Sequence, residues 1–369
     1  MKVRLGDLTR IRTGKLDANA SSIDGQYPFF TCSKEPLKIA TYSYDCECIL
    51  VAGNGDLNVK YYNGKFDAYQ RTYIIEGNDN DRLYIPYLYF FMDKYVEELR
   101  RLSIGGVIKY IKLGNLTDAM IELPDIEMQK NIVRLLSKLK DIIACRQQQL
   151  QKLDELVKAR FVEMFGNPAT NEMCWKQGSL STCVKSIDSG KSFVCSSNTR
   201  QGNWPAVLKL SAATYGVYHP EENKAMLDEK HFIEDIAVQA GDLLFTRKNT
   251  PELVGMCAYV YETPSKLMMP DLIFRLNTAR ECEKVFLWKL INHDLFRERI
   301  QEIATGSAKS MSNISKERLL NLRIILPPIE LQEQFAAFVE QTEKTKFTIQ
   351  KALDEARLLF DSLMQQYFL

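Results

Sequence analysis

The sequence contains one long motif twice, and this duplication restricts the possible folds more than any other feature. LPDIEMQ begins at Leu123 and LPPIELQ begins at Leu326, an offset of 203 residues (326 minus 123). Proline fixes its own φ and keeps the residue before it out of a helix, so each copy predicts a strand end followed by the first turn of a helix. The chain is therefore expected to fold as two similar halves that each end in a helix.

Both predicted helices are long and carry apolar residues at heptad spacing. Over residues 132–164 the apolar positions alternate at intervals of four and three residues, and residues 335–367 repeat that pattern. A seam of this length predicts a coiled coil, and we expect the two helices to pair with each other in antiparallel fashion. Two unrelated amphipathic core helices are the alternative, but they would leave the shared LPxIExQ motif unexplained. The polar exceptions within the seams are Arg146, Arg160, Thr342 and Lys346.

Composition is typical of a globular protein. The chain has 369 residues, of which 26% are charged and 46% are hydrophobic, and this is enough for two domains besides the helices. No window approaches the roughly 18 uncharged apolar residues of a membrane helix, and the N-terminus lacks the apolar core of a signal peptide. We therefore expect a soluble cytoplasmic protein. Nine cysteines without a CxxC motif and only three histidines indicate neither a disulfide framework nor a metal site.

Residues 1–122 are predicted to form an α+β domain. Strand-like runs begin at Tyr27, Cys48, Leu57 and Arg71. A helix is expected over residues 85–102, because its apolar and aromatic residues follow a helical period and basic residues gather at its end. A Gly-rich loop, SIGGVIKY, then leads to a last strand before Leu123.

Residues 167–325 repeat this order of elements. Gly190-Lys191 takes the place of Gly14-Lys15, and a helix is expected over residues 284–300. The loop ATGSAKSMSNIS stands where SIGGVIKY stood in the first half. The sequence therefore predicts two globular domains, each followed by a long helix. The four parts are residues 1–122, 123–166, 167–325 and 326–369.

The order of these parts resembles the specificity (S) subunit of Type I restriction–modification systems. The resemblance is carried by the two LPxIExQ motifs, the TGSAKSMSNIS loop, the AGDLLFTRKN strand at Ala240 and the FVEMFGNP segment at Phe161. It implies an α+β fold: two tandem α/β target recognition domains, separated and joined by two long antiparallel coiled-coil helices, with an internal pseudo-twofold repeat. Each domain would read one half of a bipartite site in double-stranded DNA, and the helices would be a spacer that docks methyltransferase subunits.

The same resemblance implies the partners and the division of chemistry. Two methyltransferase (M) subunits would use S-adenosylmethionine to methylate adenine N6, and restriction (R) subunits would supply translocation and cleavage that depend on ATP and Mg. The chain itself would bind no cofactor and no metal, and it would carry no catalytic residue. Its formal net charge of +1 then requires that DNA contacts come from charge placed locally.

Motifs that would indicate catalysis are incomplete. SGKS at Ser189 looks like half of a phosphate-binding loop, but Lys185 stands where that motif requires glycine. The sequence has no Asn-Pro-Pro-aromatic motif of an adenine methyltransferase, and its three histidines lie apart from any paired nucleophile. One alternative function is a self-contained nuclease or methyltransferase with a helical insert. The other is a coiled-coil scaffold that binds only protein.

Residues that contact DNA are expected on loops, because Arg and Lys read guanine, Asn and Gln read adenine, and any donor can bind phosphate. The best candidates are Arg247, Lys248 and Asn249, which follow a buried-looking strand. The other candidates in the second domain are Lys191, Lys209, Ser211, Tyr215, Lys309 and Ser310. Those in the first domain are Asn54, Asn58, Lys60, Tyr61, Lys65, Lys109 and Tyr110. Polar residues of the first long helix are the candidate partner contacts: Arg146, Gln147, Gln149 and Arg160.

Overall fold

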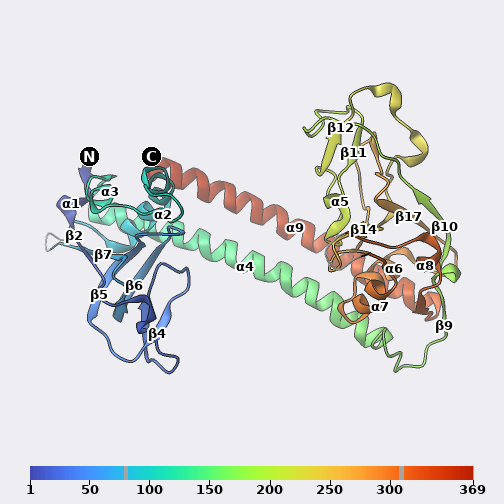
Figure 1. Cartoon of the computed structure of the whole chain (residues 1–369), viewed down its shortest axis with the longest axis horizontal. Coiled ribbons are helices and arrows are strands. Elements are labelled where there is room, and N and C mark those ends of the chain that lie inside the picture. The colour runs from blue at the N-terminus through green and yellow to red at the C-terminus, as the bar shows by residue number, and fades with distance from the viewer. Residues whose placement is uncertain (79–81, 307–310, 369) are drawn as a thin grey trace. The chain divides into compact units, whose positions relative to one another are not determined.

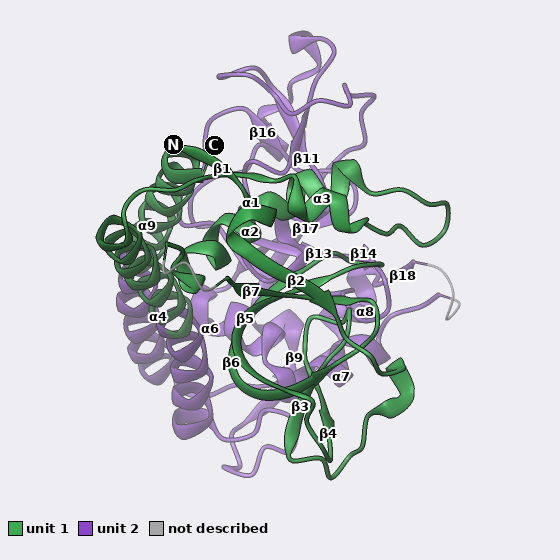
Figure 2. Ribbon diagram, turned by 90° about the vertical axis from the view of Figure 1, so that its left-hand side faces the viewer, with its two compact units in different colours: residues 1–148, 349–369 green, residues 149–348 purple. Residues whose placement is uncertain are grey.

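The computed structural model describes residues 1–78, 82–306 and 311–368 (Figure 1). Its longest elements are two helices of 40 residues each, α4 (Ile126–Phe165) and α9 (Ile329–Phe368), which confirms the two helices predicted from the duplicated motif. The chain divides into two compact units, which Figure 2 shows in different colours. Unit 1 comprises residues 1–148 and 349–369, and unit 2 comprises residues 149–348.

The ends of α4 follow from local chemistry. The Oδ1 atom of Asp125 accepts a hydrogen bond from the backbone N–H of Met128 at 2.8 Å, which satisfies one of the free donors of the first turn. After Phe165, Gly166 takes a φ of 72°, a left-handed conformation that glycine adopts without the steric cost of a side chain. In the described part of the chain, no helix combines the length and the hydropathy that crossing a bilayer requires.

Unit 1 is built on a six-stranded sheet with the order β2-β7-β5-β6-β3-β4, in which β3 and β6 pair in parallel and the other neighbours are antiparallel. Helix α2 (Ile85–Leu102) packs against β5 and β6, and it begins and ends at the predicted residues. Strands β1 (Lys2–Arg4) and β8 (Met120–Glu122) form a separate pair. The strands of the sheet are β2 (Thr9–Thr13), β3 (Tyr27–Phe30), β4 (Leu37–Ile39), β5 (Tyr44–Ala52), β6 (Val59–Ala68) and β7 (Thr72–Gly77).

Unit 2 repeats the centre of this sheet. Its four-stranded sheet has the order β10-β17-β13-β15, which matches β2-β7-β5-β6 in pairing and direction and confirms the predicted internal repeat. These strands are β10 (Val184–Ser189), β13 (Leu243–Thr246), β15 (Cys257–Tyr259) and β17 (Ile273–Thr278). The smaller sheets contain β9 (Gln177–Ser179), β11 (Ala206–Leu208), β12 (Asn223–Ala225), β14 (Lys248–Asn249), β16 (Leu267–Met268), β18 (Ser312–Asn313) and β19 (Arg323–Ile325).

The single helix predicted over residues 284–300 is wrong, because the structure divides it. The pieces are α6 (Lys284–Asn292), η5 (Asp294–Phe296) and α7 (Arg297–Glu302). His293 stands between them with extended backbone angles, and its Nδ1 atom accepts a hydrogen bond from the N–H of Leu295 at 3.3 Å. The side chain of Asn292 is meanwhile bound to the backbone of Cys257 at 2.6 and 3.0 Å. The His293 side chain caps the backbone at the break, and Asn292 fastens the end of α6 to β15. Apolar periodicity detects neither contact.

In each unit, one end of α4 packs against one end of α9 inside the core of the domain. In unit 2, the rings of Phe161 and Phe335 lie 5.4 Å apart, and Lys346 Nζ lies 2.7 Å from Asp154 Oδ1. In unit 1, Lys140 Nζ lies 5.7 Å from the ring centroid of Phe360. Positions rise along α4 as they fall along α9, so the paired ends are antiparallel, as predicted.

The predicted seam is right along most of α4 and shifts at its C-terminal end. Val157 is buried as predicted, but Phe161 and Phe165 are more deeply buried than the predicted seam residue Met164. The reason is that these two rings pack against Phe286 of α6 as well as against the α9 seam residue Phe335, so a third helix joins the two-helix seam in the core of unit 2. Each long helix is therefore also a core element of its domains.

The glutamine of each LPxIExQ motif is buried and ties its long helix to the segment just before α2 in unit 1 or α6 in unit 2. Gln129 accepts from the backbone N–H of Tyr84 at 2.9 Å and donates to the carbonyl oxygen two residues earlier at 2.8 Å. Gln332 accepts from the backbone N–H of Glu283 at 3.0 Å and donates to the carbonyl oxygen two residues earlier at 3.4 Å. Each glutamine also donates to the carbonyl oxygen of the first proline of its motif, at 2.9 Å in both copies. The motif therefore preserves a structural clamp.

Replacing Gln332 with leucine should lower the free energy of unfolding by about 1–3 kcal/mol, because buried backbone groups lose their partners. Gln334→Leu, at an exposed position of the same helix, is the control and should change stability by less than about 0.5 kcal/mol. Denaturant unfolding of both variants measures the difference. Equal stability of the two variants would show that the clamp contributes nothing.

Candidate nucleic-acid interface

Arg247 lies where the chain leaves β13, at a point where three distant segments meet. Its backbone N–H donates to the carbonyl oxygen of Leu272 at 3.0 Å, and its own carbonyl oxygen accepts from the N–H of Ile314 at 2.8 Å. Strands β14 and β18 pair beside these bonds. Residues 247–249, 272 and 312–314 are here called the unit 2 junction.

An aromatic ring supports the guanidinium group of Arg247. Its Cζ atom lies 5.1 Å from the ring centroid of Phe274, and the Nζ atom of Lys316 lies 5.5 Å from the same centroid. The Nε atom of Arg247 is buried and has no hydrogen-bond partner within the described segments. Stacking on a ring restricts the rotamers of an arginine while its N–H groups stay free to bind a ligand. Phe274 therefore holds the guanidinium of Arg247 in one orientation, in which its terminal N–H groups can donate to a ligand.

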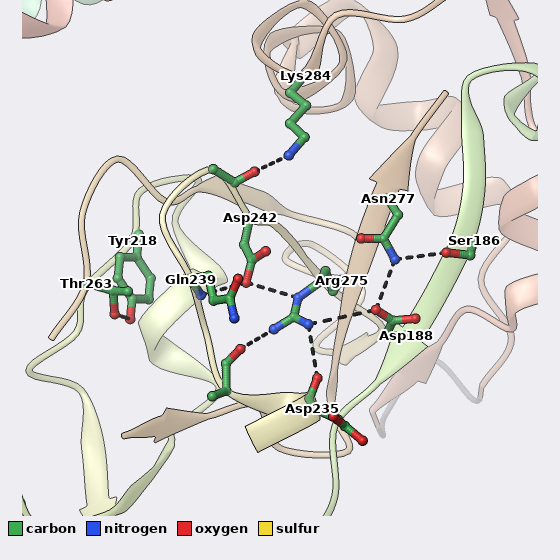
Figure 3. Close-up of polar contacts among 12 residues, drawn as sticks. Ser186, Asp188, Tyr218, Asp235, Gln239, Asp242, Thr263, Arg275, Asn277 and Lys284 are labelled. Atoms are coloured by element: carbon green, nitrogen blue, oxygen red, sulfur yellow. Dashed lines mark hydrogen bonds and ion pairs between the residues drawn. The ribbon is translucent and has the colours of Figure 1, made fainter. Parts of the chain in front are cut away.

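A polar network further along the same strands contrasts with this arrangement (Figure 3). The Nε atom of Arg275 on β17 lies 3.0 Å from Asp242 Oδ2, and its Nη1 atom donates to the carbonyl oxygen of Asp235 at 3.2 Å. Burial raises the pKa of Asp242, although a backbone N–H and the Arg275 guanidinium oppose the shift. Arg275 thus binds within the protein, where it fastens the loop before β13 to the sheet that presents Arg247.

The two residues after Arg247 differ in what they can contact. Lys248 is half-buried in β14, whereas Asn249 is only 7% exposed. The amide of Asn249 donates to Thr214 Oγ1 at 3.1 Å, and its Oδ1 atom accepts from the N–H of Thr250 at 2.9 Å. Successive residues of a strand face opposite sides, so Asn249 points inward. Asn249 is therefore a weaker candidate for DNA contact than Arg247 and Lys248.

The remaining predicted contacts of unit 2 differ in their surroundings. Ser211 Oγ and Lys209 Nζ both bind the carboxylate of Glu222, at 2.8 and 3.4 Å, and these two bonds lower its pKa. Glu222 therefore offsets the charge of Lys209. Two others are exposed: Lys191 and Tyr215. Lys309 and Ser310 lie outside the described residues.

Unit 1 has a junction with the same backbone bonds. The N–H of Gly53 donates to the carbonyl oxygen of Arg71 at 2.8 Å, and the carbonyl oxygen of Gly53 accepts from the N–H of Ile111 at 3.0 Å. Residues 53–55, 71 and 109–111 are here called the unit 1 junction. The structure brings three predicted DNA contacts together at this junction: Asn54, Lys109 and Tyr110.

The other predicted contacts of unit 1 lie at or along β6 and interact within the protein. The Nδ2 atom of Asn58 donates to a backbone carbonyl oxygen at 2.8 Å, and its Oδ1 atom accepts from Lys60. Burial lowers the pKa of Lys60. Tyr61 donates to a glutamate at 2.7 Å, and Lys65 lies 4.7 Å over a tyrosine ring. These four residues are therefore weaker candidates for DNA contact than the three at the junction.

The four predicted partner contacts lie along α4. Arg160 forms an ion pair with Glu163 at 2.8 Å, and its guanidinium lies 5.9 Å from the ring centroid of Phe338. Gln147 is exposed, whereas Arg146 and Gln149 are half-buried. Arg160 thus supports packing within unit 2, which weakens the reason for predicting it as a partner contact.

An exposed apolar stripe on α4 has no counterpart among the predicted sites. Met128, Leu135 and Ile142 are 49%, 40% and 45% exposed and follow one another at intervals of seven residues. This spacing keeps the three side chains on one face of the helix, beside the buried seam. In the sequence these three residues form a second heptad series, separate from the one that makes up the buried seam.

Two segments of the chain, residues 1–155 and 181–356, match the family model described as Type I restriction modification DNA specificity domain. The matches cover most of the chain, one in each half of the internal repeat. The chain belongs to this family. Each half is therefore one specificity domain with its own junction and its own LPxIExQ motif.

Curated relatives of this specificity chain are specificity subunits of Type I restriction enzymes. The EcoDI specificity subunit of Escherichia coli is 37% identical over 156 residues, which make up 42% of this chain and 34% of that protein. The EcoEI specificity subunit of Escherichia coli is 27% identical over 50% of this chain and 31% of that protein. The MjaVIII specificity subunit of Methanocaldococcus jannaschii is 22% identical over 95% of this chain and 89% of that protein. The chain thus spans about a third of the first two relatives and most of the last.

Solved structures share the fold of this specificity chain. A crystal structure of a Type I restriction–modification S subunit from M. genitalium matches 100% of this chain and 96% of its own, with a TM-score of 0.68 and 14% identity. A structure reported on complex assembly and conformational transition of the type I R-M system matches 100% of this chain and 97% of its own, with a TM-score of 0.55 and 16% identity. At these identities the matches establish the fold of the specificity domains.

Proposed function

We propose that the chain is the DNA-recognition subunit of a Type I restriction–modification complex, in which each specificity domain reads one half of a bipartite site in double-stranded DNA. The observation that carries this proposal is the junction that occurs in both units with equivalent backbone hydrogen bonds. Both junctions present residue types that bind base edges, such as arginine, lysine and asparagine. Membership of a DNA specificity family in both halves supports the same function.

Mobility shift of random duplex DNA tests this function against its two alternatives. We expect sequence-selective binding when the chain is combined with a methyltransferase subunit encoded beside it. Cleavage or methyl transfer by the purified chain alone would favour a self-contained enzyme. Binding of the methyltransferase without any binding of DNA would favour a protein scaffold.

The partners follow from the family. We propose that the chain assembles with two methyltransferase subunits, which bind S-adenosylmethionine, and, in a restricting complex, with restriction subunits that use ATP and Mg. The chain itself would then need to bind only DNA and protein. Because its targets would be chromosomal and invading DNA, we propose the cytoplasm as its location.

The exposed stripe of Met128, Leu135 and Ile142 is the surface that we propose for a methyltransferase subunit. Apolar side chains that recur on one face of a helix are favourable contacts for a partner, because their burial removes apolar area from water. The stripe replaces Arg160 as the leading candidate, since the charge of Arg160 is already paired with Glu163.

Leu135→Asp should weaken binding of the methyltransferase at least tenfold, because a carboxylate would be buried in an apolar contact. Gln148→Asp adds the same charge at an exposed position on another face of the same helix and should change the affinity little. Isothermal titration of the purified subunits gives both affinities. If the two variants bind alike, the stripe is not the docking surface.

A further inference from the structure

The two units place an arginine at corresponding junctions, but from different segments: Arg247 follows β13, whereas Arg71 precedes β7. In unit 2, Arg247 follows β13, and Leu272 accepts its backbone hydrogen bond at 3.0 Å. In unit 1, Gly53 follows β5, and Arg71 accepts the equivalent bond at 2.8 Å. Arg247 is thus the donor of this backbone hydrogen bond in unit 2, whereas Arg71 is its acceptor in unit 1. Each junction has one arginine at that bond.

The backbone of unit 1 explains why its arginine does not stand at Gly53. A Cβ atom added to Gly53 would lie 2.4 Å from the carbonyl oxygen of Arg71 and 3.0 Å from the ring of Tyr73. A side chain at position 53 would clash with this backbone, whereas Arg71, in the turn before β7, is exposed and has room for its side chain. Tyr73 corresponds to Phe274 of unit 2, because each is the second residue of the strand that follows.

The guanidinium group of Arg71 is free to bind a ligand. Arg71 is exposed, and none of the residues described around it forms a hydrogen bond or an ion pair with its side chain. Two other arginines of the unit are paired with carboxylates: Arg12 lies 2.6 Å from Glu76, and Arg100 lies 3.5 Å from Asp56. A lone exposed guanidinium is ordinary on a surface, so its setting decides what it can do.

That setting is a pocket of about 210 Å³ at the unit 1 junction. Gln70, Thr13 and Tyr110 line the pocket together with Arg71. Gln70 and Arg71 form the turn between β6 and β7, which a hydrogen bond from Thr72 N–H to the carbonyl oxygen of Tyr69 closes at 2.8 Å. An arginine and a glutamine held side by side are the residue types that read guanine and adenine in the major groove.

On the basis of the proposed function, we propose that Arg71 is a specificity-determining residue of unit 1. It binds the O6 and N7 atoms of a guanine through two N–H donors, and Gln70 contacts the neighbouring base pair. Arg71 thereby has in unit 1 the role that Arg247 has in unit 2. The two half-sites are read by arginines from different segments of the repeated fold: Arg71 precedes β7, and Arg247 follows β13.

A second pocket of unit 1, of about 290 Å³, does not offer the same chemistry. Its cations are Lys34, Lys60 and Arg100. Lys34 and Arg100 lie 3.7 and 3.5 Å from Asp56, and Lys60 is bound to Asn58. Asp56 offsets only part of this positive charge, so the pocket suits a phosphate contact, which carries no sequence information.

Competition binding tests the role of Arg71 with the full chain in complex with its methyltransferase subunits. The probes are a duplex that the wild-type complex methylates and its single-base variants in both half-sites. Arg71→Ala should reduce discrimination at one base pair of one half-site by about tenfold to a hundredfold and leave the other half-site unchanged. Arg71→Lys should lose most of the same discrimination, because an ammonium group lacks the planar fork of donors.

Arg4→Ala is the charge-matched control, since Arg4 lies outside the pocket and is paired with Asp118. It should leave discrimination unchanged in both half-sites. A wild-type complex without sequence preference would overturn the proposed function itself. A wild-type preference that survives in Arg71→Ala would overturn only the role of Arg71. Equal weakening on every duplex would also overturn it, because that result is the signature of a phosphate contact.

Discussion

Arg247→Ala should relax base discrimination in only one half-site, at one or two base pairs, by about 1–3 kcal/mol. Arg247 is stacked on Phe274, which holds its guanidinium in place, and a base edge would accept hydrogen bonds from its terminal N–H groups. The measurement is the affinity of the complex with the methyltransferase for its site and for single-base variants of that site.

Two further variants separate base reading from other effects of Arg247→Ala. Arg247→Lys keeps the charge but loses the bidentate geometry, so it should also lose discrimination. Arg280→Ala removes an exposed charge elsewhere in unit 2 and should change neither affinity nor discrimination. Loss of the Phe274 contact alone should cost about 0.5–1 kcal/mol of stability, which thermal unfolding detects independently of DNA. A uniform loss of affinity on all sequences would make Arg247 a phosphate contact.

Extending both long helices should abolish binding to the original site. We propose that the length of α4 and α9 sets the unread gap between the half-sites. Inserting seven residues after Leu150 and seven after Ile349 adds about 10 Å to each helix and preserves the heptad pattern. That length corresponds to about three base pairs, which also rotate the duplex by roughly a quarter of a turn or more.

Methylation mapping in cells that carry the extended chain measures this effect. We expect the same two half-sites separated by a gap about three base pairs wider. An insertion after Leu150 alone is the control, because it places the seams of the two helices out of register and should abolish methylation at both gap lengths. Full methylation of the original site by the doubly extended chain would show that the helices do not set the gap.

The order of the fold could be predicted from the sequence wherever a local signal fixes the backbone. The first turns of α4 and α9 follow a proline motif, and α2 occupies its predicted residues because its apolar period is continuous. The repeat of the sheet could be inferred from the matching order of strands and glycines. These features depend on residues that are close together in the chain, so a single sequence is enough to predict them.

The site was harder to predict, because it depends on which distant segments meet. Asn249 follows the pattern of a DNA-contacting residue, yet it faces inward and binds Thr214, which lies 35 residues away. Arg71 appears in the sequence as the start of a strand, and its relation to Arg247 becomes visible only through equivalent backbone hydrogen bonds. Candidate residues of the right chemical type could be predicted, but their grouping required the structure.

The central claim is that the two specificity domains read two separate half-sites, and selection from a pool of random duplexes tests it most directly. The chain is combined with its methyltransferase subunits, bound duplexes are recovered over several rounds, and the enriched sequences are aligned. We expect the enriched sequences to share two short blocks of fixed bases separated by an unread gap of constant length. Enrichment of a single continuous block, or no enrichment at all, would contradict it.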